Sequence, residues 1–203
     1  MKKKYIKLFG ANGSGKTATA RKLGEFLTGQ ACDYWQANLS HNFRHHYCDC
    51  ERFAAMGKWE TRLKCCGMDA ISAQKDFNYA DKIKDHIGSI KGTAIVEEGL
   101  VTSSMRIHYA INEVAELHTF LLRYPPEVCR KRIEENRGGR IKEKNLMGKY
   151  KGCNSAFKNL ELESKTLLDG SMEENVAKII EVANLIPCNC MKSRTVTTQK
   201  ELF

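Results

Sequence analysis

The sequence predicts an α/β fold with a parallel sheet, because short apolar runs typical of buried strands alternate with amphipathic helical patterns. Four such runs lie at residues 5–9, 93–96, 118–122 and 166–168. Helical patterns follow at residues 17–27, 103–117, 127–137 and 154–164, and a capping box of Ser171 and Glu174 begins a last helix. The chain has 203 residues, of which 42% are hydrophobic and 28% charged, as is usual for one globular domain. We expect this domain to span residues 1–187, with residues 188–203 as a loose tail.

A glycine-rich loop joins the first strand to the first helix. Its sequence fits G-x-x-x-x-G-K-T, a pattern in which backbone N–H groups and the positive end of a helix dipole surround phosphate groups. We expect Lys16 to reach the β- and γ-phosphates of a triphosphate and the Thr17 hydroxyl to hold Mg²⁺. The predicted triphosphate-binding residues are Gly10, Ala11, Asn12, Gly13, Ser14, Gly15, Lys16, Thr17 and Ala18.

Two carboxylates end the predicted strand at residues 93–96, in the sequence Glu97-Glu98-Gly99. Buried carboxylates are costly unless they face a metal, a proton donor or the mouth of a site. In a parallel sheet this strand end lies beside the glycine loop, so one glutamate can hold Mg²⁺ through water and either can accept a proton from an attacking hydroxyl. Strand side chains alternate between faces, so the two carboxylates need not both point at the site. We expect Glu97 to serve first and Glu98 second.

The positive charge of the chain, +9 overall, is concentrated near its middle. Residues 130–151 hold nine Lys or Arg against three Glu, which favours a polyanionic ligand. Within this segment a helical pattern ends at Gly138-Gly139, and Arg132, Arg137 and Arg140 surround that hinge. We expect residues 126–151 to form a basic lid, whose arginines stabilise charge on a transferring phosphoryl group.

The region between the first helix and the third strand is less regular. We expect a second strand at residues 31–37, loop at 38–50, one short helix face within 51–68 and a helix over 76–90. Residues 38–75 form a long insert, which we expect to carry the acceptor site. Its His41, His45, His46, Cys48 and Cys50 are candidate metal ligands, although no pair has the C-x₂-C spacing of a zinc site.

The chain has nine cysteines and no apolar run long enough for a secretory signal or a membrane span. An odd number of cysteines without an export signal favours reduced thiols. These features predict a cytoplasmic protein with no membrane partner.

Together these parts resemble the P-loop nucleoside and nucleotide kinases, and thymidylate kinase in layout. The resemblance is carried by four segments, namely residues 10–17, 97–99, 121–133 followed by Arg137, and 168–176. It implies a three-layer fold with a parallel five-stranded sheet in the order 2-3-1-4-5, helices on both faces, Mg-ATP as the donor and a lid over the phosphates. The family's Asp-Arg-Tyr or Glu-Arg-Ser is replaced here by Glu97-Glu98-Gly99, and its Arg-Glu-Pro acceptor motif is missing.

The sequence therefore predicts an ATP-dependent phosphotransferase that acts on a hydroxyl or phosphate, foremost on a nucleoside or nucleoside monophosphate. An alternative is a kinase that acts on a DNA end or on a hydroxylated base in DNA. It is motivated by the basic lid, the lysines at positions 2–4 and the aromatic residues Tyr34, Trp35, Phe43 and Tyr47. A regulatory nucleotide-binding ATPase is a third reading, and whether the chain forms a homodimer stays open.

Overall fold

A computed structural model describes residues 2–32, 35–38, 45–48, 50–57, 59, 79–99, 105–137, 141–160 and 164–188. Its strands are β1 (Lys3–Gly10), β2 (Gln36–Asn38), β3 (His45–Tyr47), β4 (Phe53–Met56), β5 (Ala94–Glu98), β6 (Ala115–Leu122) and β7 (Lys165–Leu168). Its helices are α1 (Lys16–Thr28), α2 (Tyr79–Ser89), α3 (Met105–Val114), α4 (Pro126–Arg137), α5 (Glu143–Asn159) and α6 (Met172–Ala183). None of these helices is long and apolar enough to cross a membrane.

The strands form one sheet in the order β2-β3-β4-β5-β1-β6-β7. The five consecutive strands β4-β5-β1-β6-β7 are parallel to their neighbours. Numbered along the chain they have the expected order 2-3-1-4-5, although the second of them is β4 and not the strand expected at residues 31–37. The expected total of five strands was wrong, because β2 and β3 pair antiparallel and extend the β4 edge to a mixed sheet of seven.

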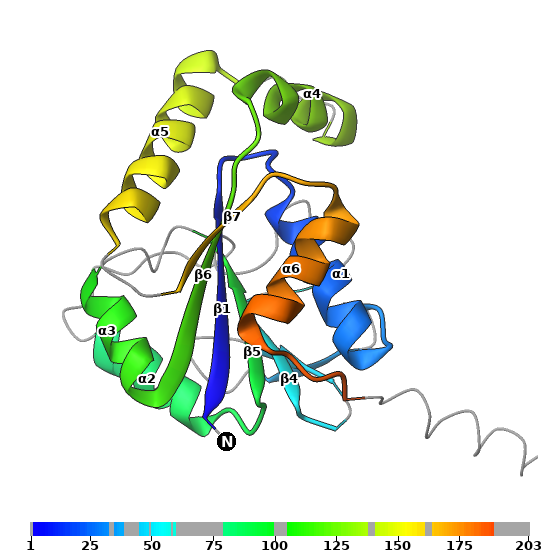
Figure 1. The fold of residues 1–203 in the computed structure, drawn as a ribbon, viewed down its shortest axis with the longest axis vertical. Coiled ribbons are helices and arrows are strands. Elements are labelled where there is room, and N and C mark those ends of the chain that lie inside the picture. Colours follow the sequence, from blue (N-terminus) through cyan, green and yellow to red (C-terminus); the bar gives the residue numbers. More distant parts are fainter. Residues whose placement is uncertain are drawn as a thin grey trace, which may run out of the picture.

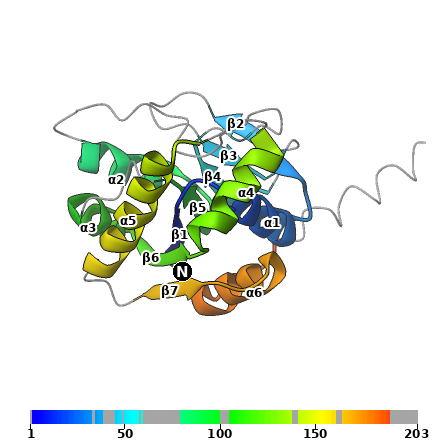
Figure 2. The same cartoon turned by 90° about the horizontal axis from the view of Figure 1, so that it is seen from above.

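Helices cover both faces of the sheet, which gives the expected three layers (Figures 1 and 2). On one face α1 and α6 pack against Ile6 and Leu8 of β1, and on the other α2 and α3 pack against Tyr5. The central strands are buried on both faces, so they are apolar runs rather than alternating ones. Helices α4 and α5 lie across the carboxyl edge of the sheet, above the end of β1 (Figure 1).

Several element boundaries differ from those expected. The helix face expected within residues 51–68 is strand β4, and the strand expected at 31–37 shrinks to β2 (Gln36–Asn38). Helix α5 begins at Glu143, not near residue 154, and Leu117 lies in β6 instead of a helix. The expected capping box of the last helix is confirmed. Ser171 accepts from the Glu174 N–H, and the Glu174 carboxylate accepts from the Ser171 N–H.

Candidate active site

The loop after β1 has a backbone conformation that only glycine adopts without strain. Gly10, Gly13 and Gly15 have φ angles of 155°, 78° and 92°. A Cβ atom at Gly13 would lie 2.3 Å from the carbonyl oxygen of Cys129, so α4 packs directly on the loop. Gly15 is the N-cap of α1 and provides no side-chain cap, so the positive end of this helix dipole faces an anion site at the loop.

Lys16 is folded back against the same loop, with 8% of its surface exposed. Its Nζ donates to the carbonyl oxygens of Gly10 (3.0 Å) and Ala11 (3.3 Å). Within the described parts of the chain no carboxylate pairs with this ammonium group, and the buried Ser14 Oγ has no hydrogen-bond partner. A cation, an unpartnered buried hydroxyl and a glycine cradle fit the phosphate groups of a nucleotide.

Thr17 and Glu98 supply a pair of oxygen donors beside the loop. The Thr17 Oγ1 donates to Glu98 Oε1 at 2.7 Å, and Glu98 is 2% exposed at the carboxyl end of β5. Hydroxyl and carboxylate oxygens are the ligands that Mg²⁺ prefers, so this pair fits the metal implied by the phosphate loop.

Glu97 points to the opposite face of the sheet. Its Oε1 pairs with Lys7 Nζ at 2.7 Å, both side chains being fully buried, and its Oε2 accepts from the Tyr5 hydroxyl at 2.5 Å. The structure therefore places Glu98, not Glu97, against the phosphate loop. Alternation along β5 implies that the two carboxylates face opposite sides of the sheet, but it does not say which side the loop occupies, so the expectation that Glu97 would serve first had no support from it.

His108 of α3 lies near the same buried ion pair and is itself fully buried. Burial, together with a smaller effect of the Lys7 charge, lowers the pKa of His108 to about 4, and the charge of Glu97 opposes this shift. The ring is therefore neutral at physiological pH.

Of the three arginines expected in a lid, Arg132 of α4 is the one that the structure places at the loop. Its guanidinium carbon lies 4.3 Å from the ring centroid of Tyr124, and its Nη1 approaches the carbonyl oxygen of Ser14 at 3.5 Å. The Tyr124 hydroxyl in turn donates to the Gly170 carbonyl oxygen (2.5 Å) and accepts from Asn175 Nδ2 (2.9 Å). The turn after β7 is thereby connected to the phosphate loop.

Tyr124 and Asn175 were not expected at the site from the sequence. Tyr124 stands beside Pro125-Pro126, where it could have been noticed as an aromatic residue at a strand end, whereas Asn175 gives no signal inside an ordinary helix.

The other expected site arginines are not placed at the loop. The side chain of Arg137 and all of Arg140 lie outside the described residues, as do His41, Tyr34, Phe43 and most of the expected acceptor insert at 38–75. The expected loose tail at 188–203 lies outside them as well, apart from its first residue.

Two of the features that motivated a nucleic-acid substrate, the lysines at positions 3 and 4 and Trp35, lie away from the loop. Lys3 and Lys4 belong to the amino end of β1, where Lys3 Nζ donates to the Ile87 carbonyl oxygen and Lys4 pairs with Glu116. Trp35 is 5% exposed and packs between Phe53 and Trp59 in the core. Trp35 is therefore unable to stack on a base.

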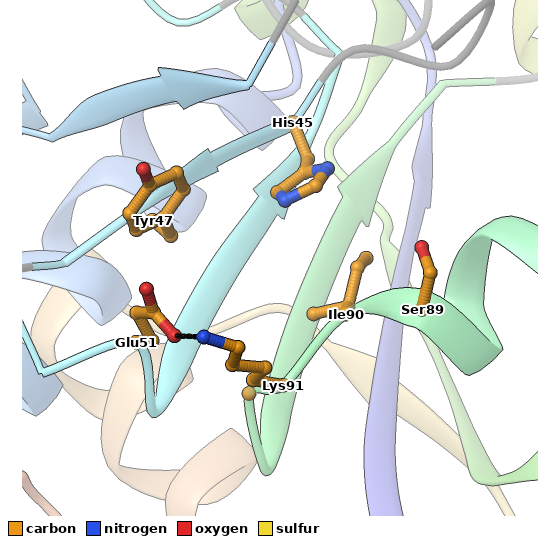
Figure 3. Close-up of a pocket in the computed structure, with 7 residues that line it drawn as sticks. His45, Tyr47, Glu51, Ser89, Ile90 and Lys91 are labelled. Atoms are coloured by element: carbon orange, nitrogen blue, oxygen red, sulfur yellow. Dashed lines mark ion pairs between the residues drawn. The ribbon is translucent and has the colours of Figure 1, made fainter. Parts of the chain in front are cut away.

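A separate pocket lies where β5 begins, away from the strand end that carries Glu98 (Figure 3). Its lining residues are His45, Tyr47, Glu51, Ser89, Ile90, Lys91 and Gly92. An ion pair of 2.9 Å joins Glu51 and Lys91 across one side of it (Figure 3). Because no residue of the phosphate loop lines this pocket, we do not assign the acceptor to it.

The candidate metal ligands of residues 41–50 separate in the structure. His45 Nδ1 lies 3.1 Å from His86 Nε2, and His46 Nδ1 lies 3.2 Å from the Gly57 carbonyl oxygen. Cys48 and Cys50 stay together, with their sulfur atoms 3.5 Å apart.

No model of a protein family matches the sequence, and no curated protein matches it. A gluconokinase from Sinorhizobium meliloti 1021 is similar in structure, with a TM-score of 0.50 and 14% identity over 89% of this chain and 91% of that one. A sugar kinase from Janibacter sp. HTCC2649 has a TM-score of 0.48 and 14% identity over 91% of this chain and 96% of its own. A deoxyadenosine kinase from M. mycoides has a TM-score of 0.47 and 12% identity over 90% of this chain and 100% of its own.

At such low identity a structural likeness shows the fold and nothing finer. The gluconokinase match and the glycine loop between β1 and α1 agree on that fold. The chain has the P-loop kinase fold.

Proposed function

We propose that the protein is an ATP-dependent phosphotransferase that moves the γ-phosphate of Mg-ATP to a hydroxyl or phosphate acceptor. The observation that carries the proposal is the meeting of three elements at one edge of the sheet. Lys16 begins α1, the Thr17–Glu98 pair joins α1 to β5, and Arg132 reaches in from α4. Each supplies charge or oxygen donors suited to a triphosphate and its metal ion.

In this mechanism the protein positions the reactants and neutralises charge, and it forms no covalent bond with them. Lys16 exchanges its contacts with the Gly10 and Ala11 carbonyl oxygens for phosphate oxygens. Arg132, held over the Tyr124 ring, stabilises the charge that develops on the transferring group. Thr17 and Glu98 are the residues that would hold Mg²⁺, which would supply positive charge against the charge of the phosphates.

We propose a small-molecule acceptor, a nucleoside or a nucleoside monophosphate. The kinase resemblance supports this acceptor, and the positions of Lys3, Lys4 and Trp35 remove two of the features that favoured DNA. One observation still favours nucleic acid, namely that α5 exposes Lys144, Lys149 and Lys151 above the carboxyl edge of the sheet.

The experiment that tests the proposal compares single variants at matched positions. Lys16→Ala and Glu98→Gln should each lower kcat/KM by about 10²–10³, the usual effect of removing one electrostatic group from a transfer site. Lys22→Ala, on the exposed face of the same helix, should keep the activity of the unmodified chain. ADP release would be followed over a panel of nucleosides and nucleoside monophosphates, with circular dichroism to verify folding. Full activity in a folded Lys16→Ala variant would refute the proposal.

A further inference from the structure

Three cysteines from two distant segments of the chain lie close together at the end of α1 that is remote from the phosphate loop. Cys48 follows β3, Cys50 lies in the turn before β4, and Cys188 follows α6. The Cys48 sulfur lies 3.5 Å from that of Cys50 and 3.8 Å from that of Cys188. All three sulfur atoms lie within 4.8 Å of one another.

The distances of the Cys48 sulfur from the sulfur atoms of Cys50 and Cys188 are close to those between thiolates around one metal ion. With Zn–S bonds of about 2.3 Å, two sulfurs of a tetrahedral site are about 3.8 Å apart, and two of a trigonal site about 4.0 Å. A cation placed among the three sulfurs can therefore contact each of them with little movement of the backbone. We propose that Cys48, Cys50 and Cys188 form a zinc site with three protein thiolates. The described residues supply three ligands, and the fourth comes from water or from a donor outside the described residues.

The surrounding backbone orients the sulfur atoms. The Phe53 N–H donates to Cys48 Sγ at 3.4 Å, a contact that stabilises a thiolate. Glu51 has a left-handed φ of 57° and donates its N–H to the Cys48 carbonyl oxygen at 2.8 Å, which closes the turn that returns Cys50 to Cys48. Cys188 is positioned from the other side, since its N–H donates to the Leu27 carbonyl oxygen at 2.7 Å.

Burial and protonation are consistent with metal entry and binding. Cys48 is fully buried, Cys188 half-buried and Cys50 exposed, so the site opens to solvent on one side. Cys188 Sγ donates to the Leu27 carbonyl oxygen at 3.3 Å as a thiol. Binding Zn²⁺ forms three Zn–S bonds and releases to water those thiol protons not already lost, so affinity should rise with pH.

The site would be structural, not catalytic. It connects the β3–β4 turn and the segment after α6 to the last turn of α1, and the 13 residues of α1 place the phosphate loop about 20 Å away. Zinc would thereby join two segments 140 residues apart in the sequence. We expect bound zinc to raise the melting temperature and to leave the phosphotransfer chemistry unchanged.

The test uses the full chain, reduced and stripped of metal. Zn²⁺ would be titrated against a chromophoric chelator, and Co²⁺ would report thiolate ligation through its charge-transfer absorption. We expect one equivalent of Zn²⁺ and a higher melting temperature. Cys48→Ser and Cys188→Ser should weaken binding more than about 100-fold, since even partners outside the ligand shell contribute 10- to 100-fold.

Two further variants keep the test decisive if a buried replacement unfolds the chain. Cys50→Ser changes an exposed residue and should also weaken Zn²⁺ binding, whereas Cys153→Ala, a buried cysteine of α5 outside the cluster, should bind as the unmodified chain does. Absence of Zn²⁺ binding by the reduced chain would overturn the proposal. So would binding that persists unchanged in Cys50→Ser and in a folded Cys188→Ser.

Discussion

Replacing Glu97 by Leu would remove the carboxylate that pairs with Lys7 inside the interface between the sheet and α3. Both side chains are fully buried, and the same carboxylate accepts from the Tyr5 hydroxyl. Removing one partner of a buried ion pair costs about 3–5 kcal/mol of unfolding free energy, because the remaining charge stays desolvated. For a chain of this size each kcal/mol lowers the melting temperature by about 2–4 °C, so Glu97→Leu should melt on the order of 6–20 °C lower.

Chemical denaturation and calorimetry would measure this loss, and a double variant separates its causes. Lys7→Met combined with Glu97→Leu removes both charges and should recover most of the unfolding free energy. A loss of about 1 kcal/mol should remain, because the Tyr5 hydroxyl has lost its hydrogen-bond acceptor. Below its melting temperature, Glu97→Leu should have a kcat/KM within about tenfold of that of the unmodified chain, whereas Glu98→Gln should not. The reason is that, of these two glutamates, Glu98 is the one that contacts Thr17. A Glu97→Leu variant that is as stable as the unmodified chain but inactive would refute this division of roles.

Three further predictions concern the loop, a buried histidine and a helix cap. Gly13→Ala should abolish ATP binding measured by calorimetry, because its Cβ would lie 2.3 Å from the Cys129 carbonyl oxygen at a φ of 78°; unchanged affinity would contradict the loop geometry. His108 has its pKa lowered from 6.5 to about 4, so the unfolded chain binds its proton first as the pH falls. Above pH 6.5 the ring is neutral in both the folded and the unfolded chain, so it causes no loss of stability there. Between pH 6.5 and pH 5 the unfolding free energy should fall by about 2 kcal/mol. Urea midpoints of the unmodified chain and His108→Phe should therefore diverge over this interval, and parallel curves would contradict the assignment. Ser171→Ala should cost about 1 kcal/mol in denaturant unfolding, since it removes the N-cap of α6, whereas exposed Ser89→Ala should cost less.

Much of the fold could be predicted because its signals are local. The glycine loop, the strand that precedes it and the Ser171–Glu174 capping box each depend on residues within one turn or one strand. The parallel part of the sheet followed from the kinase resemblance of these parts, and the structure confirms its order.

The edge of the sheet was not predictable in the same way. All four residues of β4 are buried, so Phe53–Met56 shows no alternation and fits a helix face as well as a strand. The first half of helix α5 was missed because Gly148 and Gly152 are poor helix formers that weaken the helical pattern of the sequence. Only Leu146, Cys153 and Phe157 of this helix are buried, so its apolar face is sparse.

The choice between Glu97 and Glu98 depends on which face of β5 meets the loop. A signal did exist in the sequence, because Lys7 is a charged residue within an apolar strand and requires a buried partner. The structure pairs Lys7 with Glu97 in register across β1 and β5. Cys188 could not be associated with Cys48 from sequence, since only the packing of α6 on α1 brings them together.

The measurement that tests the central claim most directly is the fate of the γ-phosphate of labelled ATP. The full chain and its Lys16→Ala variant would be incubated with Mg²⁺ and a mixture of nucleosides, nucleoside monophosphates and DNA with and without hydroxylated bases. We predict label in the small-molecule fraction with the unmodified chain and almost none with Lys16→Ala. Label in DNA would contradict the proposed acceptor, and label only in free phosphate would contradict phosphotransfer itself.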